Sequence, residues 1–202
     1  ADMQAKLDGE CMPRYQAVEI MAGQTLAMGM AQAGCRGYIA IRGGICVPAV
    51  LGSRSTDLKC RIGGLAGRAL QAGDCLPIAP EAAAAVLPQV QLPLPEYPEE
   101  AAVRVILGPQ AEYFTSNGIA DFLQAVYEVS AASDRMGIRL EGPAVESIAG
   151  TDIVSDGIVF GSVQITSSGQ PILLMADHPT AGGYAKLATV LSFDWSKLAQ
   201  LR

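Results

Sequence analysis

The chain has 202 residues, a net charge of −6 and an isoelectric point near 4.8. Half of its residues are hydrophobic and 17% are charged, so it has the composition of a protein with a packed core rather than a disordered chain. The acidic balance argues against a nucleic-acid partner, which requires a basic surface. No apolar run reaches the roughly 18 residues that a membrane span needs, so we expect no membrane partner.

Cysteine and histidine usage argues against a metal centre. The five cysteines are odd in number, lack C-x-x-C spacing and share the chain with a single histidine, His178. A Cys/His zinc site is therefore poorly supported. We expect no metal, a cytoplasmic location and reduced thiols that pack as small hydrophobic groups.

The first part of the chain predicts short strands between glycine turns. Residues 15–78 contain runs of β-forming residues at Thr25–Met28, Tyr38–Ile41 and Ile45–Val47, a spacing typical of a barrel or sandwich. We expect residues 1–80 to form a first β subdomain, truncated at its N-terminus. An Ala/Pro-rich connector should follow at 81–103, with one or two helical turns at Ala82–Ala85 and an extended segment through Pro88, Pro93, Pro95 and Pro98.

Residues 104–202 predict a second β subdomain. Strands are expected at Arg104–Leu107, Tyr127–Ser130 and Ser162–Ile165, and turns at Ser155–Gly157 and Ser167–Pro171. Ser116 or Asn117 should cap a helix with one apolar face, and a short final helix should run from Ser196 to Leu201. That face should contain Ile119, Phe122, Leu123 and Val126. The predicted fold class is therefore mainly β with few short helices.

The segment Ala176–Lys186 combines an acid, the only histidine, a hydroxyl, paired glycines, a phenol and an amine. Apolar runs at 172–175 and 187–191 flank it, so it predicts a polar loop between two buried strands, where binding groups tend to gather. Asp177 directly follows a buried run, where an unpaired carboxylate is costly. We expect its partner to be Lys186, an arginine from another loop, or a ligand nitrogen. A glycine turn with solvated polar groups is the alternative.

Arginines supply two further candidate anion sites. Arg135 and Arg139 are four residues apart around Gly137, so on a strand they share a face and could hold a carboxylate or phosphate. Surface pairs with Asp134 and Glu141 are the alternative. Arg54 lies among small hydroxyl residues after Gly52, which favours an anion nest or an ordinary serine-rich turn.

Two common catalytic motifs are missing from the sequence. The glycines at 63, 64 and 67 lack the G-x-x-x-x-G-K-[ST] spacing of a phosphate-binding P-loop. There is also no G-x-S-x-G motif, which argues against serine hydrolase chemistry.

Four clusters, at 51–56, 63–68, 133–142 and 176–186, together resemble the allophanate hydrolase subunit 2 family, also called the biotin-dependent carboxyltransferase or KipA family. The resemblance runs from Ala1 to Arg202. Members usually have residues before the first and after the last position, so we expect this chain to be a fragment. Members commonly read Thr-Thr-Gly-Gly-Tyr-Pro near position 181; this chain has Ala181 and Ala185 instead.

The resemblance implies cyclophilin-like β-barrel architecture and an enzyme subunit that works with a KipI-like subunit 1. One branch is the C subunit of an ATP-dependent 5-oxoprolinase, which converts 5-oxoproline to glutamate; a lactam-utilisation-like subunit is then a further partner. ATP would be used by the complex, without a P-loop in this chain. The alternatives are a urea carboxylase-like carboxyltransferase, whose biotin is carried on another domain, and a non-enzymatic KipA-type regulator that sequesters a kinase inhibitor.

The site expected from these patterns has two parts. Asp177 and Lys186 are the expected catalytic residues. The expected substrate-binding residues are Arg54, Ser55, Arg135, Arg139, Thr180, Gly182, Gly183 and Tyr184.

Overall fold

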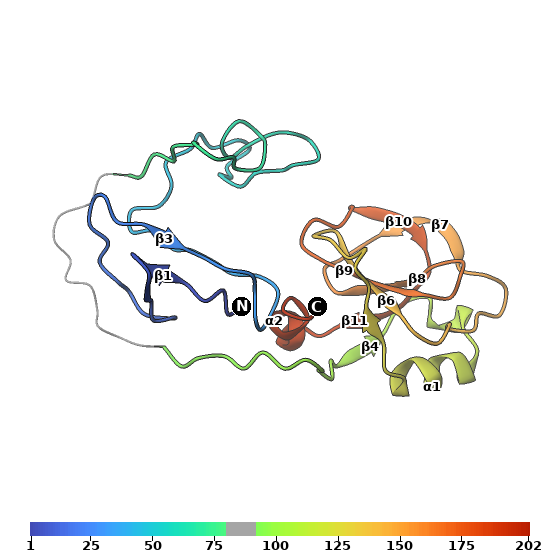
Figure 1. Cartoon of the computed structure of the whole chain (residues 1–202). Coiled ribbons are helices and arrows are strands. Elements are labelled where there is room, and N and C mark those ends of the chain that lie inside the picture. Colours follow the sequence, from blue (N-terminus) through green and yellow to red (C-terminus); the bar gives the residue numbers. More distant parts are fainter. Residues whose placement is uncertain (80–91) are drawn as a thin grey trace. The chain divides into compact units, whose positions relative to one another are not determined.

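The computed structural model describes residues 1–79 and 92–202 (Figure 1). Contacts divide the chain into two compact units. Unit 1 contains residues 1–14, 20–37 and 93–202, and unit 2 contains residues 15–19 and 38–92. Within unit 1, residues near position 35 bind the end of the chain. Gln200, for example, accepts hydrogen bonds from the backbone N–H groups of Cys35 and Arg36 at 2.9 and 3.0 Å.

The expected connector falls only partly within the described residues. The helical turns expected at Ala82–Ala85 and the residue Pro88 lie outside them. The described prolines Pro93, Pro95 and Pro98 belong to a segment without regular secondary structure. The division into domains at 1–80, 81–103 and 104–202 stays a prediction.

The main element of unit 1 is a six-stranded antiparallel sheet in the order β4-β11-β8-β9-β6-β5. Its strands are β4 (Val105–Leu107), β5 (Glu128–Val129), β6 (Gly137–Glu141), β8 (Ser162–Ile165), β9 (Pro171–Leu174) and β11 (Lys186–Val190). The strands expected near 104–107, 127–130 and 162–165 are confirmed. The central strand β8 is buried on both faces, and Val163, Ile165 and Leu187 are completely buried.

Two smaller sheets complete the strands. β7 (Asp152–Gly157) pairs with β10 (Ala181–Tyr184) in an antiparallel ribbon, and β1 (Lys6–Leu7) lies between β2 (Glu10–Cys11) and β3 (Leu26–Ala27). Two expectations are therefore wrong. The turn expected at Ser155–Gly157 is the end of a strand, and the loop expected at 176–186 contains a strand, since backbone pairing between the two segments outweighs their glycine and serine content.

Helix α1 (Ser116–Gln124) confirms the expected helix, but its N-cap is Thr115. The Thr115 hydroxyl accepts the Gly118 N–H at 2.9 Å, which satisfies one of the free amides of the first turn. Ile119 and Phe122 pack on the core, whereas Leu123 and Val126 are exposed. The apolar face is therefore narrower than the sequence pattern suggested.

The remaining helices are short. A 3₁₀ helix, η1 (Ala111–Tyr113), follows β4, and η2 (Ser192–Asp194) leads into α2 (Trp195–Leu198) at the position of the expected final helix. Asp194 is fully buried and accepts two hydrogen bonds from the Arg104 guanidinium, each 2.9 Å long. This pair joins the end of the chain to the start of β4, and it holds the pKa of Asp194 well below its usual range.

Unit 2 differs from the barrel or sandwich expected for residues 15–78. Its described residues contain isolated β-bridges, such as Ile45 with Ile78, but no extended strand. Tyr38 and Ile39 are exposed, so these β-forming residues do not pack against a core there. The cysteines are also exposed rather than packed, because they lie in segments with few buried neighbours; they are Cys11, Cys35, Cys46, Cys60 and Cys75.

The mainly β fold with few short helices is confirmed, although the sheets are not closed into a barrel: β4 and β5 are the edges of the six-stranded sheet. Among the described residues, no helix has both the length and the apolar character that a membrane crossing requires.

Candidate functional site

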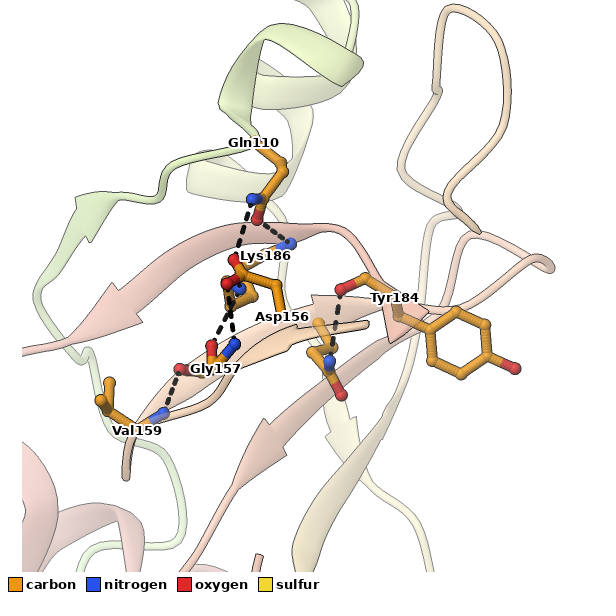
Figure 2. A network of polar contacts seen from close by, with 8 residues as sticks. Gln110, Asp156, Gly157, Val159, Tyr184 and Lys186 are labelled. Carbon is orange, nitrogen blue, oxygen red and sulfur yellow. Dashed lines mark hydrogen bonds and ion pairs between the residues drawn. The ribbon is translucent and has the colours of Figure 1, made fainter. Parts of the chain in front are cut away.

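Lys186 is a buried lysine at the start of β11, with only 4% of its surface exposed. Its Nζ donates to Asp156 Oδ2 at 2.5 Å and to the carbonyl oxygen of Gly157 at 2.9 Å (Figure 2). An ammonium group has three N–H donors, and these contacts use two of them. A buried charge needs such partners, so the bonds to Asp156 and Gly157 fix the position of the Lys186 ammonium group.

Backbone pairing brings Asp156 to Lys186. Asp156 lies on β7, opposite Gly182 on β10, and β10 is followed after one residue by Lys186. The pairing of β11 with β8 shifts register between Lys186 and Ala188. Such a bulge changes the direction of the side chains on a strand. The ribbon and the bulge together thus place the acid and the amine within hydrogen-bonding distance.

Gln110 completes this group from the segment between β4 and η1. Its Oε1 accepts the backbone N–H of Lys186 at 3.2 Å, and its Nε2 donates to Asp156 Oδ2 at 3.4 Å (Figure 2). Lys186, Asp156 and Gln110 are called the lysine cluster below.

The lysine cluster favours the ionised form of Asp156. Its carboxylate accepts from Lys186, from the Gly157 N–H at 2.8 Å and from Gln110. The bonds from Lys186 and Gly157 are the leading causes that lower the pKa of Asp156. Desolvation raises this pKa by more than the weaker bond from Gln110 lowers it. The site therefore contains a carboxylate that is 53% exposed and held by a buried cation.

Of the three partners expected for Asp177, the structure shows an arginine from another loop, Arg135. Arg135 donates through Nε to Asp177 Oδ2 at 2.6 Å and through Nη2 to Oδ1 at 3.1 Å. The backbones also bond, since the Asp177 N–H donates to the Arg135 carbonyl at 3.0 Å, which extends the pairing of β6 with β9. Both side chains are accessible, at 68% and 46% exposure. The expected contact across two clusters therefore forms between these two residues, and Lys186 bonds to Asp156 instead.

The glycine-rich segment forms part of the β7–β10 ribbon. Gly182 packs closely, because a Cβ there would lie 2.7 Å from Ile158 Cδ1 and 2.9 Å from Gln164 Nε2. The backbone carbonyl of Tyr184 accepts a hydrogen bond from Gln164 Nε2. The Tyr184 ring points away from the lysine cluster (Figure 2). Gly183 lies within the same strand, and the exposed Thr180 accepts the Ile158 N–H through its backbone carbonyl.

The remaining predicted site residues form hydrogen bonds outside the lysine cluster and the Arg135–Asp177 pair. Arg139 is exposed on β6, whereas Arg135 precedes that strand, so the two do not share a single strand face as expected. Arg54 and Ser55 belong to unit 2, where Arg54 Nε donates to the Val47 carbonyl at 3.1 Å. His178 Nδ1 bonds the carbonyl of Pro179 at 2.7 Å.

Sequence reasoning missed Asp156 and Gln110. Asp156 lies in a Ser-Asp-Gly run that is typical of turns, and nothing in its local pattern marks it as the partner of a lysine 30 positions away. Gln110 follows Gly108-Pro109 and lies between two elements. The one available signal was Lys186 itself, because a lysine at the start of an apolar strand requires an acid nearby.

Two features bear on metal and nucleotide binding among the described residues. These residues contain no group of three His, Cys, Asp or Glu side chains placed to hold a metal ion. Gly63, Gly64 and Gly67 do not form an open phosphate cradle, because a Cβ on each would collide with atoms of Ser55, Thr56 or Arg61.

The whole chain, residues 1–202, matches the family model described as carboxyltransferase domain, subdomain A and B. It is 37% identical to the C subunit of the 5-oxoprolinase of Haemophilus influenzae over 97% of this chain and 62% of that protein. It is 36% identical to the C subunit of the 5-oxoprolinase of Escherichia coli over 100% of this chain and 64% of that protein. The chain thus spans just under two thirds of the length of these relatives.

The fold of this chain is also similar to that of a solved structure. The urea carboxylase of Kluyveromyces lactis matches with a TM-score of 0.88 and 29% identity, over 99% of this chain and 20% of that one. The expected family is thereby confirmed: this chain belongs to the carboxyltransferase family that is defined by subdomains A and B.

Proposed function

We propose that this chain is part of a subunit of an amide-processing enzyme complex, of the type represented by the C subunit of 5-oxoprolinase. The observation that carries the proposal is the identity of 36–37% to two such subunits over at least 97% of the chain. The reaction is the opening of the lactam of 5-oxoproline to glutamate, driven by ATP in the assembled complex.

The lysine cluster supports a role at the lactam oxygen. Opening an amide places negative charge on its oxygen, and preorganised donors in a site shielded from water stabilise that charge. Two N–H groups of Lys186 bond to Asp156 and Gly157, which leaves a third donor on a fixed ammonium. We assign this donor to the substrate's carbonyl oxygen, and Asp156 keeps the lysine charged and oriented.

Arg135 suits the carboxylate of the substrate. Its guanidinium is exposed and already binds a carboxylate, that of Asp177, in a two-point geometry. In this proposal the substrate's carboxylate replaces or shares the place of Asp177. Thr180 and the backbone at Gly182 and Gly183 complete the binding surface. Tyr184 belongs to the same ribbon.

The complex supplies what this chain lacks. We assign nucleotide binding to another subunit, because the glycine turn of unit 2 is filled by its own backbone and side chains. The partners are a KipI-like subunit 1 and a lactam-utilisation-like subunit, and the complex is cytoplasmic. Both partners would present loops to the lysine cluster.

A second candidate function is carboxyl transfer to urea. The TM-score of 0.88 to the urea carboxylase of Kluyveromyces lactis supports it. In that case biotin arrives on another domain, and Lys186 and Arg135 would hold negative charge on the transferred carboxyl group rather than on a lactam.

The experiment is a reconstitution of the full-length subunit with its co-purified partner subunits. Glutamate release from 5-oxoproline that depends on ATP supports the first function. Consumption of urea that depends on ATP, bicarbonate and biotin, without glutamate release, supports the second. A complex that forms but performs neither reaction overturns both and leaves the regulatory role.

A further inference from the structure

The turn before η1 is pressed against the backbone around Lys186. The Gly108 N–H donates to the Leu187 carbonyl at 2.7 Å, and the Gln110 N–H donates to the Lys186 carbonyl at 3.4 Å. A Cβ on Gly108 would collide with the Lys186 carbonyl oxygen and lie 3.1 Å from the Ala188 nitrogen. Only glycine allows this approach, so the place of Gln110 beside Lys186 is built into the backbone.

The chemistry of the contacts determines how the Gln110 amide is oriented. The backbone N–H of Lys186 can only donate, so the side-chain atom that it meets at 3.2 Å must be the oxygen. The NH₂ group then faces Asp156 Oδ2 at 3.4 Å and donates to it. An NH₂ group held in this way favours the ionised carboxylate, because it can donate to Oδ2 but cannot accept a hydrogen bond from a protonated Oδ2.

We propose that Gln110 is a positioning residue, which holds the Asp156 carboxylate in its ionised form and in line with the ammonium of Lys186. The role of that pair in turnover rests on the proposed function, whereas the action of Gln110 on Asp156 does not. Sequence reasoning gave no role to this residue.

Ionisable groups lie near Asp156 on its own strand and on the elements packed around it. Lys186 on β11 bonds to it directly, and Asp152 lies on the same strand, opposite Tyr184 of β10. Glu112 of η1 is exposed. Hydrogen bonds from Lys186, Gly157 and Gln110 lower the pKa of Asp156, and the contribution of Gln110 is the smallest of the three. The test must therefore detect a change that is specific to this contact.

The test follows the titration of Asp156 by carboxyl ¹³C NMR in Gln110→Glu and in a matched control, Gln170→Glu. Gln170 binds the backbone of Gly142 in the same way, through its Oε1 at 3.2 Å and its Nε2 at 3.0 Å, so both of these bonds go to a backbone rather than to a carboxylate. Both variants add one negative charge. We expect the titration midpoint of Asp156 to move upward in Gln110→Glu and to stay at the parental value in Gln170→Glu.

Gln110→Ala serves as a second variant, because it removes the donor without adding charge and should give a smaller upward movement. Equal Asp156 midpoints in Gln110→Ala, Gln170→Glu and the parent overturn the proposal. In the reconstituted complex, the acidic limb of the pH–rate profile should move with the midpoint in Gln110→Glu. If the midpoint moves and the profile does not, the positioning role stands and the catalytic role of the lysine cluster fails.

Discussion

Lys186 Nζ lies 2.5 Å from Asp156 Oδ2, and this contact joins a lysine side chain that is 5% exposed to an acid that is 53% exposed. The pair is asymmetric, because water reaches one partner and not the other. Loss of the acid leaves a buried charge, whereas loss of the lysine leaves an acid that can be hydrated.

The first prediction follows from this asymmetry. Asp156→Ala should lower the melting temperature more than Lys186→Met does, because only the first change leaves an ammonium buried with the Gly157 carbonyl as its remaining partner. Lys186→Met should reduce turnover of the reconstituted complex by about 100-fold or more, the loss typical of a missing oxyanion donor. Thermal unfolding and steady-state kinetics provide the measurements. Near-parental turnover in folded Lys186→Met would remove the lysine from the chemistry.

The second prediction concerns Arg135 and Asp177. Each is well exposed, so Arg135→Ala and Asp177→Asn should each change the free energy of unfolding by no more than about 1 kcal/mol. Arg135→Ala should raise KM for the substrate by about 10- to 100-fold if the guanidinium makes a charge-assisted bond. The double variant tests whether the two residues act as a unit, in which case its kinetic loss is smaller than the product of the single losses. An unchanged KM in folded Arg135→Ala would reduce the pair to a surface ion pair.

The third prediction compares two glycines of the β7–β10 ribbon. Gly182→Ala should cost about 1–3 kcal/mol, since its Cβ would press on Ile158 and on Gln164, whose amide holds the Tyr184 carbonyl. Gly157→Ala is the matched control, because nothing lies within 4 Å of a Cβ at that position. Chemical denaturation of both variants measures the difference. Equal stabilities would show that the ribbon accommodates the added methyl group.

The fourth prediction is a pH dependence in unit 2. Arg68 donates twice to Asp74, at 2.7 Å each, and with the Gln71 N–H it lowers the pKa of Asp74 to about 2. Because the folded-state pKa is depressed, the stabilisation is present above the unfolded value of about 4 and is lost as the pH falls toward 2. The protection of the Gln71 amide, measured by NMR as its exchange rate relative to that of an unfolded amide at the same pH, should decrease over this window in the parent.

The control for that titration is Asp74→Asn. In this variant the protection of the Gln71 amide should be lower already at neutral pH and should not decrease further as the pH falls from 4 to 2. A protection that follows the same pH course in both proteins would assign the effect to other groups.

Local patterns were sufficient for several elements. The β-forming residues at 162–165 and the apolar run at 187–191 predicted strands, and β8 and β11 confirm them. The helix near 116 followed from its amphipathic spacing, but its cap moved to Thr115. The threonine hydroxyl reaches the free amide of Gly118 there, and the sequence offered three neighbouring residues with a suitable side chain.

The sequence alone determined the family, the mainly β class and the presence of reactive groups between 176 and 186, because these depend on residue type and spacing. Tertiary structure decided the partners. Asp177 follows β9 and meets Arg135 because β6 pairs with β9, and Lys186 meets Asp156 because β7 pairs with β10. Strand pairing joins residues 30 and 42 positions apart, and a linear pattern contains no information about which acid a given cation will reach.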